Sequence, residues 1–233
     1  MAQKKAPIGV EDNIKKVLRE YSEALLLAIV IALLVRVFIF SSYKIPTEAM
    51  VPTLQVGDFI IGSKLSYGFK LPFIEKQYFS KLPKRGEVVI FKCKKSGASE
   101  CIKRIVALPG DRVQIIKKNL FINNKKADYQ FLPLEKDGQA NVIEKIGQSE
   151  RIISITHSRV LENYGPVVVP PKHFFVLGDA RDSTEDSRVW GMIPFKHLQA
   201  KALFVWMSLD WRDYWAKKGA VRVRWDRIFK KIE

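Results

Sequence analysis

The sequence contains few of the side chains from which metal centres and charge-relay triads are built, with 3 histidines and 2 cysteines among its 233 residues. The histidines stand alone, each without an acidic partner at a suggestive spacing: His157, His173 and His197. A Ser-His-Asp triad stays an alternative, because triad members need only meet in space, but no motif favours it. Cys93 and Cys101 lack the second pair or nearby histidine that completes a zinc site. We therefore predict no metal and no cofactor.

The two cysteines bracket a polar, glycine-containing segment, residues 94–100. This segment could close a hairpin and bring the two side chains face to face. A disulfide is expected if the region lies outside the cytoplasm, and two free thiols are the alternative. The sequence leaves both open.

Acidic side chains are also scarce, because 24 Asp and Glu residues stand against 40 Lys and Arg residues, a formal net charge of +16. This balance indicates an anionic partner, either a nucleic acid or an anionic membrane surface. No basic helix, zinc-finger spacing or aromatic RNA-binding signature is present, so a nucleic acid is not expected. A hydrophobic run near the N-terminus favours the lipid bilayer as the partner.

That run extends from Ala24 to Phe40 and contains a single charge, Arg36. As a helix rising about 1.5 Å per residue it would be roughly 25 Å long, slightly short of a bilayer core of about 30 Å. Tyr21 and Tyr43 flank the run at positions suited to the membrane interface. Arg36 lies near the end of the run and can extend toward the headgroups. A buried core helix is the alternative, but the run is apolar all round.

The distribution of Lys and Arg around the run predicts its orientation. Five basic residues precede it within residues 1–23, whereas Lys44 alone lies between it and Lys64. By the positive-inside rule, residues 1–23 form a cytoplasmic tail, residues 24–40 a transmembrane signal anchor and residues 41–233 an exported domain. A cleavable signal peptide fits less well, because no small-residue cleavage motif follows the run.

Beyond the anchor, short alternating apolar runs bounded by turn residues predict β-strands. They cover residues 58–62, 87–91, 102–108, 112–116, 120–122, 174–177 and 202–207. No strand–helix–strand alternation appears, so a parallel sheet is not expected. The more polar stretch 114–172 is interpreted as an insertion with its own β-structure. The predicted fold is mostly β: an exported, barrel-like antiparallel domain with a β insertion, anchored by one N-terminal transmembrane helix.

Four segments, in order, carry a resemblance to a known family. They are IPTEAMVPTL (residues 45–54), RGEVVIF (85–91), KRIVALPGD (103–111) and GDARDSTEDSRVWG (178–191). Together, behind an N-terminal anchor, they resemble the type I signal peptidases, bacterial membrane proteases that remove signal peptides from exported preproteins with a serine–lysine dyad. The resemblance implies that the exported domain is catalytic.

The resemblance places the serine nucleophile of the family at Ala49 and the general base at Lys103. A lysine amine can activate a hydroxyl only when it is neutral, and a solvated lysine is almost wholly protonated at neutral pH. Burial against apolar surface disfavours the ammonium form, and Lys103 is flanked by Ile102, Ile105 and Val106. A solvated surface charge is the usual state of a lysine, but the motif around Lys103 favours the catalytic role.

Two threonines also match functional positions of the family. The hydroxyl of Thr47, with the backbone N–H of Ala49, corresponds to the donors that stabilise the oxyanion. Thr184 corresponds to the residue whose hydroxyl orients the lysine amine. A simple hydrogen bond within a loop is the alternative for Thr47.

Further residues are assigned by position in the motifs. Charged side chains of the last motif are expected to form structural ion pairs behind Lys103: Asp179, Arg181, Asp182, Asp186 and Arg188. Apolar side chains are candidates to line shallow pockets for small substrate side chains, or are ordinary core residues: Ile45, Met50, Leu54, Ile90 and Ile102. Ala180 departs from the asparagine usual in the family. Tryptophans are available for contact with the bilayer: Trp206, Trp211, Trp215 and Trp225.

The function that these residues imply is that of a signal peptidase I-type serine protease of the bacterial inner membrane, with the catalytic domain on the outer side. Its partners would be signal peptides and the lipid bilayer. With Ala49 at the nucleophile position, the chain is expected to bind substrate without cleaving it. The loss of one oxygen atom is the minimal inactivating change, which favours an engineered substitution over a natural loss. The alternative is a non-catalytic, membrane-anchored module that binds signal peptides.

Overall fold

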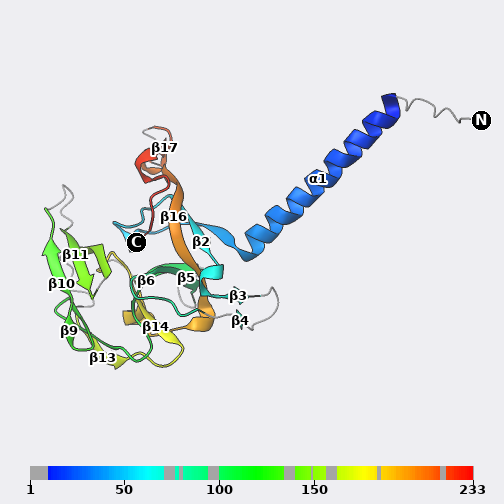
Figure 1. The fold of residues 1–233 in the computed structure, drawn as a ribbon. Coiled ribbons are helices and arrows are strands. Elements are labelled where there is room, and N and C mark those ends of the chain that lie inside the picture. Colours follow the sequence, from blue (N-terminus) through cyan, green and yellow to red (C-terminus); the bar gives the residue numbers. More distant parts are fainter. Residues whose placement is uncertain are drawn as a thin grey trace, which may run out of the picture.

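The computed structural model describes residues 10–70, 77–78, 81–93, 100–133, 140–147, 149–155, 162–182, 185–215 and 219–232. A long helix, α1 (Val10–Phe38), projects from a curled β domain that contains most of the remaining chain (Figure 1). Within it, residues Asn13–Phe38 are long and apolar enough to cross a membrane, and none of their apolar window is buried. The expected mostly-β fold with one N-terminal apolar helix is confirmed.

The end of α1 differs from the expected end of the anchor. The helix ends at Phe38, and Phe40 already begins strand β1 (Phe40–Lys44), which pairs with β2 (Asp58–Ser63). Tyr43 therefore does not flank the span at an interface. It is only 8% exposed and packs in the core of the β domain. Pairing with β2 satisfies the backbone groups of the last residues of the apolar run, which is why the strand begins there.

The main sheet is antiparallel throughout the described residues, in the order β1-β2-β16-β5-β6-β14-β15, with β17 paired to β16. Its other strands are β5 (Val88–Lys92), β6 (Glu100–Ala107), β14 (His173–Leu177), β15 (Ile193–Pro194), β16 (Leu198–Asp210) and β17 (Arg222–Val223). The pairing of β16 shifts register against both β2 and β5. Such irregularities increase twist and bend a sheet, so β16 can join the two halves of a curled one.

The sheet is buried on both faces around β5. Ile90 packs into one apolar cluster with Tyr43, Ile60 and Val205, whereas Phe91 packs into another on the opposite face. Successive side chains of a strand point to opposite faces, so β5 supplies both clusters. Residues on β5 and on its neighbour β6, which carries Lys103, are thereby held rigidly.

The insertion consists of two smaller sheets (Figure 1). One has the order β13-β7-β8-β9, formed by β7 (Arg112–Ile116), β8 (Asn119–Ile122), β9 (Lys125–Lys126) and β13 (Tyr164–Val168). The other has the order β10-β11-β12, formed by β10 (Asp128–Phe131), β11 (Ala140–Ile146) and β12 (Ser149–Ile155). The strands expected at residues 112–116 and 120–122 pair as a hairpin, with Lys117 and Lys118 at positive φ in a two-residue turn. The expected β-structure of the insertion is present.

The remaining elements are short. They include two helices, α2 (Ser187–Trp190), which contacts β14, and α3 (Arg212–Trp215), and a separate two-stranded sheet of β3 (Phe69–Lys70) and β4 (Gln77–Tyr78). The 3-10 turns are η1 (Glu48–Met50), η2 (Leu65–Tyr67), η3 (Phe195–His197) and η4 (Trp225–Arg227).

Candidate active site

The first motif forms the turn that presents residue 49. Thr47 has extended backbone angles, φ −132° and ψ 161°, and η1 follows directly, so the chain reverses at Ala49. Met50 and Leu54 are buried beneath the turn, whereas Thr47 is exposed and Ala49 half-buried. The backbone N–H of Ala180 donates to the carbonyl of Ala49, with 3.2 Å between N and O. The turn is thus fixed from below by the core and from one side by the last motif.

Lys103 lies in the middle of β6, opposite Val89 of β5, and only 4% of it is exposed. Its strand packs against η1, the turn that carries Ala49. The Lys103 Nζ lies 5.6 Å from the centroid of the Trp190 ring. Burial lowers the pKa of Lys103 to about 8, with the charge of Arg188 adding to the effect and Asp186 and Asp179 opposing it. With this pKa roughly a tenth of Lys103 is neutral at pH 7, far more than for a solvated lysine.

The four motifs meet at one buried ion pair. Arg104, next to Lys103, donates from Nε and Nη2 to the two carboxylate oxygens of Asp179, at 2.8 and 2.6 Å. Its Nη1 donates to the carbonyl of Gly86 at 2.8 Å, and the Thr53 hydroxyl donates to Asp179 at 2.6 Å. Arg104 and Asp179 side chains are each 1% exposed. Thr53, Gly86, Arg104 and Asp179 come from the first, second, third and fourth motif respectively.

Arg104 and Thr53 are site residues that the sequence motifs do not single out. A signal for Arg104 exists, because it directly follows Lys103 in the third motif, and a buried arginine needs an acidic partner. The predicted ionic role of Asp179 is consistent with this pair. The pairing partner, however, comes from outside the predicted set.

The other four predicted ionic residues also have partners, two of them within that set and two outside it. Asp186 pairs with Arg188 at 2.7 Å and caps the N-terminus of α2, accepting from the backbone N–H of Arg188. Asp182 pairs with Lys118 at 3.0 Å, and Arg181 donates to Glu144 at 2.6 Å. Lys118 and Glu144 both belong to the insertion, so the last motif is joined to it by charge.

Comparison with known proteins shows the family of this chain. The family model for signal peptidase, peptidase S26, matches residues 18–207. The chain belongs to the signal peptidase S26 family. It is 35% identical over 217 residues to a signal peptidase I of Pseudomonas aeruginosa, covering 86% of this chain and 76% of that protein. It is 37% identical over 213 residues to a signal peptidase I of Pseudomonas fluorescens, covering 84% of this chain and 75% of that protein.

A relative from Rickettsia bellii, also a signal peptidase I, is 29% identical over 260 residues, covering 96% of this chain and 89% of that protein. A solved signal peptidase I from Enterococcus faecalis V583 covers 52% of this chain and 97% of its own at 22% identity, with a TM-score of 0.33.

In this S26-family chain, the candidate pocket residues gather on the side of the sheet that carries the Ala49 turn. Ile45, Met50, Leu54 and Ile90 are buried in one cluster, and the partly buried Ile102 packs against it. Because these side chains also make up the core, their role in substrate recognition stays a prediction.

Several candidate residues lie elsewhere. Thr184 and His157 lie outside the described residues. His173, in β14, has its Nδ1 2.8 Å from the carbonyl of Pro171, and His197 ends η3. Within the part of the chain that the structure describes, no group of three or more His, Cys, Asp or Glu side chains is placed to hold a metal ion.

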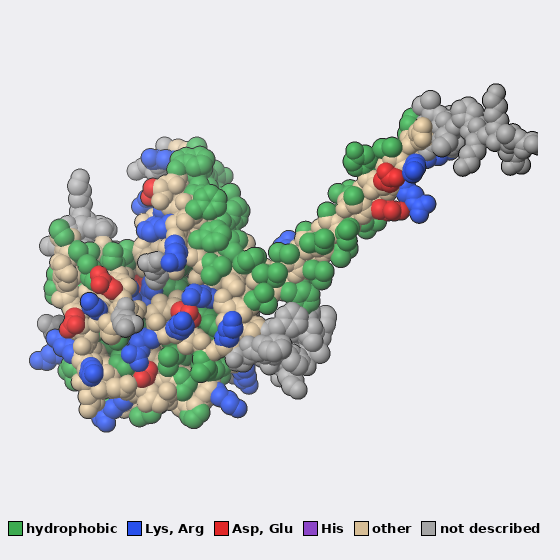
Figure 2. Space-filling view, in the orientation of Figure 1, with side chains coloured by type: hydrophobic (Ala, Val, Ile, Leu, Met, Phe, Trp, Pro, Cys, Tyr) green, Lys and Arg blue, Asp and Glu red, His purple; other side chains and the backbone are tan. Residues whose placement is uncertain are grey.

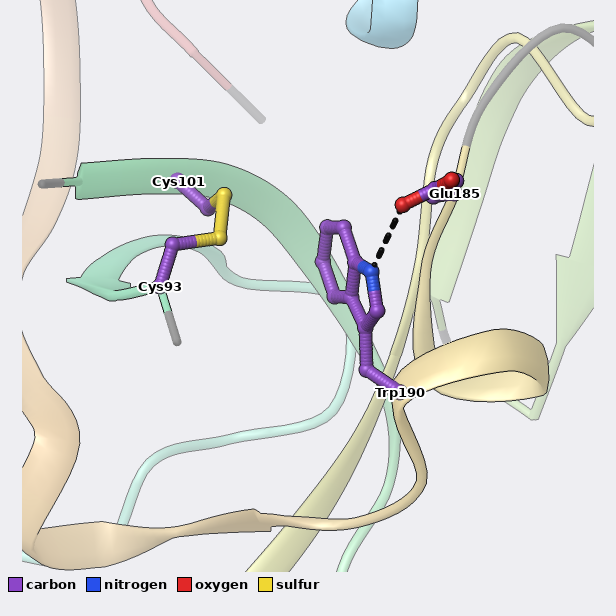
Figure 3. Close-up of a disulfide and its surroundings, with 4 residues drawn as sticks. All are labelled: Cys93, Cys101, Glu185 and Trp190. Atoms are coloured by element: carbon purple, nitrogen blue, oxygen red, sulfur yellow. Dashed lines mark hydrogen bonds between the residues drawn. A yellow bond between two sulfur atoms is a disulfide. The ribbon is translucent and has the colours of Figure 1, made fainter. Parts of the chain in front are cut away.

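Cys93 and Cys101 form a disulfide across the ends of β5 and β6, one of the two arrangements that the sequence leaves open (Figure 3). Both half-cystines and Trp190 pack against the apolar cluster around Phe91. The indole N–H of Trp190 donates to Glu185 at 2.9 Å, on the side away from the disulfide (Figure 3). Two residues before Lys103, the strand that carries the lysine is thereby cross-linked to its neighbour.

Proposed function

We propose that this chain is a signal peptidase I-type serine protease in which position 49 is the nucleophile position, Lys103 is the general base, and Ala49 makes the chain inactive. The burial of Lys103 on a strand that packs against the residue-49 turn carries this proposal. A buried lysine with a pKa lowered to about 8 is costly to maintain and suits a base in acyl transfer.

With serine at position 49, the reaction would proceed in two steps. The serine hydroxyl attacks the scissile carbonyl carbon while the Lys103 amine accepts its proton, and the resulting ammonium then protonates the leaving amine. Water then attacks the acyl-enzyme, again with Lys103 as base, and releases the signal peptide. The backbone N–H of residue 49 and the Thr47 hydroxyl would stabilise the oxyanion, and Thr184 would orient the lysine amine.

Ala49 removes the oxygen that forms the acyl-enzyme. Thr47 cannot replace it without leaving the oxyanion site, and a comparable loss in a serine protease costs about 10⁶ in kcat. The Ala49 chain is therefore proposed to fold and bind signal peptides without cleaving them. A substitution of one atom fits an engineered change better than the gradual decay of an unused enzyme.

The chain is proposed to reside in the bacterial inner membrane. Residues 1–23 form a cytoplasmic tail, the following part of α1, residues 24–38, the anchor, and the rest of the chain the domain on the outer side, with residues 114–172 as its insertion. The space-filling view shows hydrophobic side chains over the β16–β17 end of the domain, continuing to the base of α1 (Figure 2). Trp225, which follows β17 in the chain, and Phe229 are each 76% exposed. Trp206 is half-buried, and the side chain of Trp215 lies outside the described residues.

The alternative, a binding module that never cleaves, is favoured only by Ala49 itself. A module that merely holds signal peptides would have no need for a buried lysine beside the peptide-binding turn. The state of Lys103 therefore separates the two functions.

The deciding experiment changes Ala49→Ser in the full chain in lipid or detergent and assays cleavage of a preprotein with alanine at the first and third positions before the cut. Cleavage by the serine form, and none by the Ala49 chain, is the expected result. Lys103→Met in the serine form is the control and should abolish cleavage. If the folded serine form does not cleave, the binding-module function replaces the protease.

A further inference from the structure

The insertion contains a fully buried carboxylate, Glu144 of β11, whose partners lie in two parts of the chain. Arg151 faces it from the neighbouring strand β12, and Arg181 reaches it from the last motif. Arg181 donates from both terminal nitrogens to both carboxylate oxygens of Glu144, with Nη1 and Oε1 2.6 Å apart. Burial raises the pKa of Glu144, but the charges of Arg181 and Arg151 outweigh it and bring the pKa to about 2. Glu144 is therefore ionised.

From Arg181, contacts continue to the turn at residue 49. The Arg181 Nε donates to the carbonyl of Gly178 at 3.2 Å. The backbone N–H of Arg181 donates to the carbonyl of Ser154 in β12, and the N–H of Ser154 donates to the carbonyl of Asp179, both at 2.9 Å. Ala180, between them, donates its N–H to the carbonyl of Ala49. The insertion is thus hydrogen-bonded to the backbone of residues 179–181, and this segment is in turn hydrogen-bonded to Ala49.

Strand β12 also contacts the site at its other end. The Ser149 side chain lies against Gly86 so closely that a Cβ at position 86 would come within 2.3 Å of the Ser149 Oγ. The carbonyl of Gly86 accepts from Arg104, the neighbour of Lys103. One end of β12 thus contacts the segment 179–181 and the other contacts Gly86, so the insertion packs directly against the candidate active site.

We propose that Glu144 is a positioning residue for the turn at residue 49, acting through Arg181 and the segment 178–181. This inference rests on the proposed protease function. A bidentate arginine–carboxylate pair has one preferred geometry, so Glu144 fixes where Arg181 and its backbone lie. Displacing a reacting group by about 1 Å can cost about 10²-fold in rate, so a small movement of the residue-49 turn would be measurable.

The test uses the full chain with Ala49→Ser, comparing Glu144→Asp with Tyr129→Phe. Aspartate keeps the charge but withdraws the carboxylate by one methylene, so it cannot keep both bonds to Arg181. Tyr129 donates to the same carboxylate at 2.9 Å from within the insertion, so its loss perturbs Glu144 without breaking the link to Arg181. Glu144→Asp should lower kcat about tenfold or more with KM unchanged, whereas Tyr129→Phe should change neither.

Equal kcat values for Glu144→Asp and the parent, or equal losses in both variants, would overturn the proposal. If Glu144→Asp does not fold, Arg181→Lys gives the same test, because it keeps the charge and removes the planar fork. A loss confined to KM would also contradict positioning of the nucleophile.

A second measurement does not depend on catalysis. Amide hydrogen exchange of the Ala49 chain labelled with ¹⁵N-alanine reports on Ala180, with Ala107 and Ala202 in buried strands as internal references. Glu144→Asp should accelerate exchange at Ala180 and leave the two references unchanged. If the serine form proves inactive but this selective effect is found, the proposed function fails and the positioning role stands. If Ala180 is unaffected in an active enzyme, the positioning role fails alone.

Discussion

The Nζ of Lys103 lies 5.6 Å from the centroid of the Trp190 ring, a tryptophan of the last motif that is also hydrogen-bonded to Glu185. The ring acts on the lysine in two opposing ways. It excludes water, which disfavours the ammonium form, and its π face attracts a cation, which favours that form. Burial is the largest cause that lowers the pKa of Lys103, so we expect exclusion of water by the ring to be the stronger of its two effects.

The first prediction concerns the pH dependence of cleavage by the Ala49→Ser chain. The base must be neutral, so kcat/KM should fall about tenfold for each pH unit below the pKa of Lys103 and level off above it. The acidic limb should bend near pH 8, the value to which burial lowers that pKa. Cleavage rates measured across this range in saturating lipid provide the check. A limb that bends near the pKa of a solvated lysine would show that Lys103 is hydrated in the enzyme.

The second prediction concerns stability and uses the Ala49 chain itself. Because the folded pKa of Lys103 is about 8 and the unfolded value is 10.5, the unfolded chain binds more protons between these values. The free energy of unfolding should therefore rise with pH across this window, by roughly 3 kcal/mol in all from this group. Lys103→Met should remove the rise. Urea unfolding followed by tryptophan fluorescence at several pH values measures both chains, and parallel pH profiles would contradict the prediction.

The third prediction concerns Trp190. Trp190→Ala opens the space over the Lys103 amine to water, so the pKa of Lys103 should rise and the acidic limb of the serine form should move to higher pH. Trp190→Phe keeps an apolar ring over the amine and serves as the matched control, with a smaller shift. The comparison needs only pH–rate profiles of the two variants. If the pKa of Lys103 falls in Trp190→Ala, the attraction between the ring and the ammonium is stronger than the exclusion of water by the ring.

Much of the architecture could be predicted from the sequence because the relevant signals are local. Alternating apolar residues bounded by glycine or proline place strands such as 58–62 and 112–116 within a residue or two of their observed ends. Uniform apolarity identifies residues 24–38 of α1 but not its charged first part, which begins at Val10. Strand β1 could not be predicted in this way, because its first residue, Phe40, ends the apolar run and the next three show no apolar alternation; its pairing with β2 makes it a strand.

The candidate site could be predicted only as far as its motifs reach. Ala49 and Lys103 stand inside recognisable segments, and the structure places η1 against the strand of Lys103. The partners of the charged residues could not be read in the same way. Glu144 belongs to an insertion without a motif, and its pairing with Arg181 spans 37 positions of sequence. Such pairings depend on the path of the chain, which residue spacing does not encode.

The last prediction concerns the ion pair on which the four motifs converge. Asp179→Asn leaves the guanidinium of Arg104 buried without a counter-charge, and breaking a buried pair in this way costs about 3–5 kcal/mol. Thr53→Val keeps the shape and the charges but removes the hydroxyl, which donates to Asp179 and accepts from Arg104, so it should cost about 1–3 kcal/mol. Urea unfolding of both variants in the Ala49 chain measures the difference. If Asp179→Asn were no more destabilising than Thr53→Val, the charge of Asp179 would contribute little to stability. The Arg104–Asp179 pair would then not explain how the four motifs are held together beside Lys103.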